Sequence, residues 1–314
     1  MRSAIPIPGF LSVKRETGIG KLSVRSSTTA VGARKNGSLS TLVCRGIAVI
    51  VLGTLWWFQQ QADAILEKGW QILRTNWLFQ HESFEPFLSA GSFFFFIGVW
   101  GFLDFFVPSA SNNRLFPSDD VSSWFGGTRI RDQTLWYIAP LVILDLIFPR
   151  RQLPEAAPSL LRLTLEVVGA IAVYDAAFFA WHATLHSNPT LYRRVHATHH
   201  KCRVQRAPEA VRHTFIDGTM DVLCSVFALN VVGCHPLSRA VYDVVIIALI
   251  TELHAGYDFP WQLHRIVPFE LLGGPPRHER HHRDGNVYMQ KFGTYLDEAF
   301  GFLPADDVGG RVSH

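Results

Sequence analysis

Cysteine and charge are both scarce in this chain of 314 residues. None of its 4 cysteines forms a C-x-x-C pair, so the sequence lacks the ligand spacing of a zinc ribbon and the redox motif of a thioredoxin-like protein. Charged residues make up 18% of the chain, against roughly 25% in an ordinary soluble domain. Because 48% of the residues are hydrophobic, the composition also excludes an intrinsically disordered chain and a small disulfide scaffold.

Aromatic side chains are abundant instead, with 24 Phe and 9 Trp, which indicates a surface that meets lipid. A bilayer core of about 30 Å is crossed by about 20 helical residues, and residues 87–107 meet that length with one charge, Asp104. Further apolar segments are residues 46–58, 134–148, 160–181, 220–233 and 240–253. The last two are short, and we interpret them as a hairpin that dips into the membrane. We expect an all-α, polytopic integral-membrane helical bundle; a soluble helical core is the alternative.

The amino-terminal residues 1–45 carry eight Lys or Arg and one acid, Glu16, and many Ser and Thr. Three interpretations are open: a disordered cytosolic arm that satisfies the positive-inside rule, an organelle transit peptide, or a nucleic-acid-binding tail. We favour the first and expect no nucleic-acid partner. The second keeps a plastid or mitochondrial membrane open as the location.

Histidine is concentrated: of 14 in the chain, eight fall in three short motifs that we call the histidine boxes. Box one has the pattern H-x-x-x-H, and boxes two and three both read H-x-x-H-H. Their members are His182 and His186; His196, His199 and His200; His278, His281 and His282. On a helix, positions i, i+3 and i+4 lie on one face, so each box presents its imidazoles toward one point. We expect the first helix to stop before Pro189, a new helix to carry box two, and a third to end at Gly285.

A single histidine is usually a structural residue, but eight in three boxes favour metal binding, because neutral imidazole is the commonest protein ligand for metals. One structural zinc takes about four ligands. Eight or more imidazoles without accompanying cysteines therefore indicate two metal ions, each with an open position. Imidazole suits Fe, Zn, Cu and Ni alike, so the spacing does not choose the metal.

Four further residues are candidates for the same site: Asp175, His213, His254 and Asp258. Asp175 lies seven residues before His182 on one helical stripe, where it could accept a hydrogen bond from the second ring nitrogen of a ligand. Its alternative role is to pair two helices. His254 follows the last apolar segment and could complete a metal site, or else form an interfacial hydrogen bond. Asp258, four residues after His254, lies on the same helix face as His254 only if the helix continues through Gly256.

The predicted hairpin leaves and returns on one side of the membrane, so all three boxes lie on one membrane face. If the basic arm is cytosolic, two earlier pairs of apolar segments bring box one back to the cytosol. Arg150 and Arg151 then fall on the opposite side, against the rule. We expect a histidine-rich, metal-binding cap that faces the cytosol.

The boxes, their order and the intervening hairpin resemble the fatty acid hydroxylase/sterol desaturase superfamily of membrane non-haem di-iron oxygenases. The chain is most similar to the cholesterol 25-hydroxylase-like group, on residues 254–261 (H-A-G-Y-D-F-P-W), on Gly273-Gly274 before box three, and on Tyr174-Asp175 before box one. The resemblance implies four parts: a basic arm over 1–45, amino-terminal membrane helices over 46–130, a catalytic domain over 131–303, and a tail over 304–314.

By resemblance, the box histidines and His254, and with weaker support His213 and Asp258, would hold two iron ions. O₂ would be the co-substrate, and the reaction would hydroxylate a C–H bond of a sterol or an acyl chain. Electrons would come from NAD(P)H through cytochrome b5 or a reductase, a separate partner because no haem-binding domain is recognisable in the sequence. The implied location is the endoplasmic reticulum membrane.

Three other functions remain open at this stage. A sterol or acyl desaturase would use the same scaffold. A membrane zinc hydrolase would need H-E-x-x-H with Glu as base, and box three reads H-E-R-H-H. An inactive lipid-binding protein would keep the fold without metal.

Overall fold

The computed structural model describes residues 38–115, 130–147, 153–201 and 205–310, and in these ranges all regular elements are helical. The predicted all-α class is confirmed. Residues 1–37 of the predicted arm lie outside the described residues. Residues 39–45, assigned to that arm, instead form the start of a helix, because the Ser38 side chain accepts a hydrogen bond from the backbone of Thr41 and caps it.

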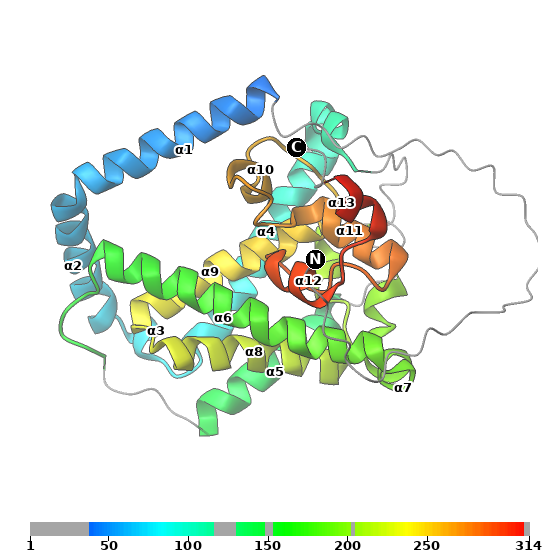
Figure 1. The fold of residues 1–314 in the computed structure, drawn as a ribbon. Coiled ribbons are helices and arrows are strands. Elements are labelled where there is room, and N and C mark those ends of the chain that lie inside the picture. Colours follow the sequence, from blue (N-terminus) through cyan, green and yellow to red (C-terminus); the bar gives the residue numbers. More distant parts are fainter. Residues whose placement is uncertain (1–37, 116–129, 148–152, 202–204, 311–314) are drawn as a thin grey trace, which may run out of the picture. The chain divides into compact units, whose positions relative to one another are not determined.

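The chain forms longer helices and, between some of them, short helical segments (Figure 1). The longer helices are α1 (Leu39–Trp57), α2 (Gln59–Thr75), α4 (Phe84–Phe106), α5 (Ile130–Ile147), α6 (Leu160–Ser187), α8 (Phe215–Val232), α9 (Pro236–Leu253) and α11 (Gly274–Asp284). The short ones are α3 (Trp77–Gln80), α7 (Pro189–Leu191), α10 (Leu263–Ile266), α12 (Tyr295–Phe300) and α13 (Ala305–Gly310).

Four of these helices, α1, α4, α6 and α8, are long and apolar enough to cross a membrane. The prediction of a polytopic integral-membrane protein is confirmed. Helix α8 is longer than the half-hairpin expected over residues 220–233, because the Thr214 side chain caps it with a bond from Asp217 N–H and so adds a turn at its start. Helix α6 ends at Ser187, directly before Asn188 and Pro189, as predicted.

The core lies between α6, α8 and α9, with α6 packed on both of the others, and α4 packs along α9 (Figure 1). Tyr174 and Phe178 of α6 belong to the same buried cluster as Leu229 of α8 and Leu253 of α9. Helix α11, which carries box three, contacts α9. This packing brings the end of α6, the end of α9 and the whole of α11 to one place.

Two buried carboxylates on α4 fix its direction relative to α9. Near the beginning of both helices, Glu85 accepts two hydrogen bonds of 2.8 Å from the Arg239 guanidinium. Near the end of α4, Asp104 accepts from Arg114, Arg206 and the Tyr257 hydroxyl, which follows α9. The two helices therefore run parallel, with the beginning of one beside the beginning of the other and the end of α4 beside the segment that follows α9.

We predict that Asp104→Ala lowers the free energy of unfolding by about 3–5 kcal/mol, because it leaves buried guanidinium groups without their counter-charge. The side chain of Asp104 is only 1% exposed. The matched control is Asp306→Ala. The Asp306 side chain pairs with Arg280 and is 68% exposed, so its loss should lower the free energy of unfolding much less. Denaturant unfolding in detergent micelles measures both, and equal losses would contradict the prediction.

Candidate metal centre

Each histidine box sits where a helix ends or tightens. His182 and His186 lie one turn apart on the last turns of α6. Box three lies on α11, which ends where Gly285 takes φ 83°, as predicted. Box two does not form the expected new α-helix. After the three-residue α7, residues Tyr192–His196 form a π-helical turn closed by a bond from Ala197 N–H to the Tyr192 carbonyl oxygen, and His199–Lys201 form a 3₁₀ turn.

The described histidines gather in two groups, within each of which the ring nitrogens available as ligands lie within 4.8 Å of one another. Group one is His182, His186, His196, His200 and His281, and group two is His199, His254, His278 and His282. The structure thus brings together all nine histidines that the sequence predicts as ligands. Neighbours in the chain are divided between the groups: His199 and His200 go apart, and so do His281 and His282.

In four of the rings, Nδ1 bonds to an acceptor that belongs to neither group, and in three of these the acceptor is a backbone carbonyl oxygen. His182 bonds to Met289 at 2.7 Å, His281 to Val287 at 2.7 Å, and His254 to Ile250 at 2.8 Å. His196 bonds instead to the carboxylate of Asp217 at 2.7 Å. Since Nδ1 donates in each case, Nε2 keeps its lone pair and points inward.

The inward nitrogens are spaced as ligands of shared ions would be. In group one, Nε2 of His196 lies 3.0 Å from that of His182 and 3.1 Å from that of His200. In group two, Nε2 of His278 lies 3.0 Å from that of His254. Two nitrogens about 2.1 Å from one ion and at a right angle to each other lie about 3.0 Å apart. The Nε2 of His186 is buried without a hydrogen-bond partner in the described residues. These donors fit two divalent transition-metal ions.

Burial keeps these rings neutral. It lowers the pKa of His200 and that of His254 to about 4, and it lowers the pKa values of His278, His281 and His282 as well, with neighbouring histidines adding to the effect at box three. A metal-binding imidazole must be deprotonated. At neutral pH the lone pairs are therefore available.

Two of the weaker candidates lie outside both groups. The ring of His213 stacks on that of His199, with centroids 4.3 Å apart, and its Nδ1 lies 2.6 Å from the Tyr137 hydroxyl. Asp258 accepts bonds from Arg265 at 2.8 Å and from His264 at 3.0 Å. Burial opposes its ionisation, but these two bonds outweigh it and lower the pKa of Asp258 to about 2. Its carboxylate is thus held in an ion pair, away from the groups.

The expected bond from Asp175 to His182 is not formed. The Asp175 carboxylate accepts instead from the backbone N–H of Phe292 and of Gly293, both at 2.8 Å, and from the Gln290 amide at 2.7 Å. Three donors of this one segment thus hold the carboxylate, while Nδ1 of His182 bonds elsewhere. It acts on His182 indirectly, by holding the segment whose Met289 carbonyl orients that ring.

Sequence reasoning missed three polar residues beside the site. Asp217, the anchor of His196, stands four residues after His213 in the first turn of α8, and this spacing was the one signal for it. One turn on, Asp221 accepts from Tyr137 and Tyr174 and pairs with Lys291 at 3.0 Å. The Lys291 ammonium also lies 3.6 Å above the centre of the Phe178 ring. No sequence spacing links Lys291 to a partner 70 residues away.

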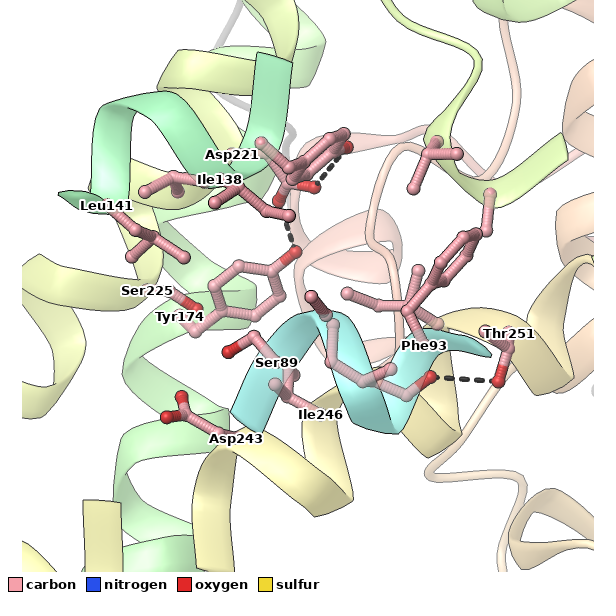
Figure 2. Close-up of a pocket in the computed structure, with 17 residues that line it drawn as sticks. Ser89, Phe93, Ile138, Leu141, Tyr174, Asp221, Ser225, Asp243, Ile246 and Thr251 are labelled. Carbon is pink, nitrogen blue, oxygen red and sulfur yellow. Dashed lines mark hydrogen bonds between the residues drawn. The ribbon is translucent and has the colours of Figure 1, made fainter. Parts of the chain in front are cut away.

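Two cavities adjoin at the histidines. The smaller, which we call the inner cavity, measures about 310 Å³. It is lined by five histidines, by Phe178 and by Lys291, the histidines being His182, His199 and His278 of the boxes, and His213 and His254. The larger, the apolar cavity, holds about 750 Å³ between α4, α5, α8 and α9 (Figure 2). Ala210 lines both cavities. The apolar space thus lies against the histidine-lined one and shares Ala210 with it as a wall residue.

The chain is similar in sequence to a known protein family and to several named proteins. The fatty acid hydroxylase family model matches residues 167–302, which include all nine grouped histidines. The chain is 34% identical to cholesterol 25-hydroxylase of Mus musculus over 171 residues, 54% of this chain and 57% of that protein. It is 33% identical to the Homo sapiens protein over 183 residues, 57% of this chain and 66% of that protein.

A longer match joins the chain to cholesterol 25-hydroxylase-like protein 2 of Danio rerio, 30% identical over 271 residues, 79% of this chain and 91% of that protein. The mammalian matches cover less than two thirds of those relatives. No solved structure shows significant similarity to the chain. On the family match and the long zebrafish alignment, the chain belongs to the fatty acid hydroxylase family.

Proposed function

We propose that the protein is a membrane oxygenase that uses two iron ions and O₂ to hydroxylate a C–H bond of a lipid, most specifically a sterol. The observation that carries the proposal is the junction of two buried groups of neutral imidazoles with a large apolar cavity. Relatives named cholesterol 25-hydroxylase support the sterol.

In this proposal group one would hold one iron ion and group two the other, and the bound iron would supply the chemistry by which O₂ oxidises the C–H bond. The protein's own residues position the metals and the lipid. Backbone carbonyls and Asp217 fix the rings, the apolar cavity takes the lipid and excludes water, and Asp175 holds the segment that orients His182. We take residues 131–303 as the catalytic domain, of which the family model matches residues 167–302. The site faces the cytosol on the endoplasmic reticulum membrane, where a cytochrome b5 or a reductase delivers electrons from NAD(P)H.

The zinc hydrolase alternative depends on Glu279, since His278, Glu279 and His282 also spell H-E-x-x-H. The carboxylate of Glu279 accepts a backbone hydrogen bond from Gln205. Group two contains four histidines, two more than that motif supplies, and this larger set of ligands favours the oxygenase.

We predict that His281→Ala and His199→Ala each lower the bound iron from about two ions to about one per chain, because each removes a ligand from a different group. Turnover of the sterol should fall about 100-fold or more in both, with membrane insertion unchanged. Elemental analysis of the purified protein and product assays measure the two effects. The control is Asp258→Asn, which should keep both ions because that carboxylate pairs with Arg265; loss of an ion there would restore Asp258 to the ligand set.

We also predict that membranes supplied with ¹⁸O₂, an electron donor and a panel of sterols yield a product that contains one labelled oxygen. Hydroxylation keeps an atom from O₂ in the product, whereas desaturation leaves an unlabelled alkene. Mass spectrometry of the extracted lipids distinguishes them. An alkene as the sole product would assign the protein to the desaturases of the same scaffold.

A further inference from the structure

The apolar cavity has a polar end that the proposed chemistry does not use. Its lining includes Ser89 of α4, Ser225 of α8 and Asp243 of α9. In Figure 2 these three side chains lie on one side of the cavity, and Phe93 and Thr251 lie on the other. Asp243 is 9% exposed. Burying an ionisable side chain among apolar helices is costly unless it has polar partners.

Helix register places the three polar residues at one level. The ion pair of Glu85 with Arg239 aligns α4 and α9, and Ser89 and Asp243 each lie four residues, one turn, further along. On α8, the Ser225 hydroxyl lies 2.8 Å from that of Tyr242, the neighbour of Asp243.

This polar end is far from the histidines. Asp243 precedes His254, a member of group two, by eleven residues on α9, which corresponds to about 16 Å of helix. At the opposite end the lining residues are Thr251 and Ala210, and Ala210 also lines the inner cavity. The cavity is thus an apolar tube with hydrogen-bonding groups at one end and the proposed reaction centre at the other.

The other polar residues of the cavity wall bond mainly to one another. Asp221 accepts from Tyr174, Tyr137 and Lys291, so this network braces the wall between the two cavities. At the remote end, the Asp243 carboxylate has about four acceptor sites and can accept a hydrogen bond from a hydroxyl in addition to its protein contacts. The hydroxyls of Ser89 and Ser225 line the same end.

We infer that Asp243, with Ser89 and Ser225, binds the hydroxyl of a sterol and thereby directs the opposite, apolar end of that lipid to the histidines. The inference rests on the proposed function and names its substrate class and its specificity residues. A lipid with one hydroxyl at the end of a long, rigid apolar body matches both the chemistry and the length of the cavity. The hydroxyl sets the depth of entry and hence which carbon meets the metals.

The test is equilibrium binding of tritiated cholesterol to the full-length protein in detergent, with competition by the hydrocarbon analogue that has hydrogen in place of the hydroxyl. Wild type should prefer cholesterol about tenfold, because a hydrogen bond to a carboxylate distinguishes the two. Asp243→Leu should lose this preference and keep its affinity for the hydrocarbon, which shows that the cavity is intact. Asp243→Asn, which retains an acceptor oxygen, should keep most of the preference.

The control Glu298→Leu, an exposed acid of α12, should bind as wild type does. An undiminished preference in Asp243→Leu would overturn the inference. If that variant binds neither ligand, the double variant Ser89→Ala, Ser225→Ala decides: a reduced preference supports the inference and an unchanged one overturns it. Hydroxyl-dependent binding without product would reject the proposed function alone, and product with an Asp243-independent preference would reject this orientation alone.

Discussion

The inward nitrogens of the two histidine groups approach one another to 3.0–3.2 Å, a separation at which two neighbours cannot both carry a proton. A ring that is to bind a metal ion must be neutral and must carry its proton on its outer nitrogen. For four of the rings the fold supplies an acceptor for that proton, a backbone carbonyl from each of three segments and the carboxylate of Asp217. Much of the carboxyl-terminal part of the chain is organised to supply those acceptors. The Asp297 carboxylate accepts from the N–H groups of Met289 and Gln290, and the Asp175 carboxylate accepts from those of Phe292 and Gly293.

The same helices that carry the histidines also build the lipid-sized space. Helix α9 lines the apolar cavity along its length and then delivers His254. Helix α8 supplies Asp217 to a ring at its start and Val222 and Ser225 to the cavity beyond. Because one rigid element spans both, a shift of the membrane helices moves the walls of the cavity and the ring anchors together. Parallel packing of α4 on α9, fixed at each end by a buried carboxylate, resists such a shift.

The metal site could be predicted from the sequence because its signal is local. Spacings of four residues bring His182 with His186, His196 with His200, and His278 with His282 into one group each. The residues at a spacing of three, His199 and His281, belong to the other group, so the expectation that each box presents its imidazoles toward one point was wrong for boxes two and three. The ends of α6 and α11 were likewise marked by Asn188-Pro189 and by Gly285. What failed was pairing across the fold. Helical spacing suggested His182 as the partner of Asp175, but the carboxylate meets a loop over 110 residues away, and Lys291 offered no spacing at all.

The adjacent histidines of boxes two and three have a mechanical consequence. His199 and His200 belong to different groups although one peptide bond joins them, and the same holds for His281 and His282. Two such bridges tie the pair of cages into a single unit, so the gap between their centres is set by covalent geometry more than by packing. A displacement of a ring in one cage therefore moves the backbone that carries a ring of the other.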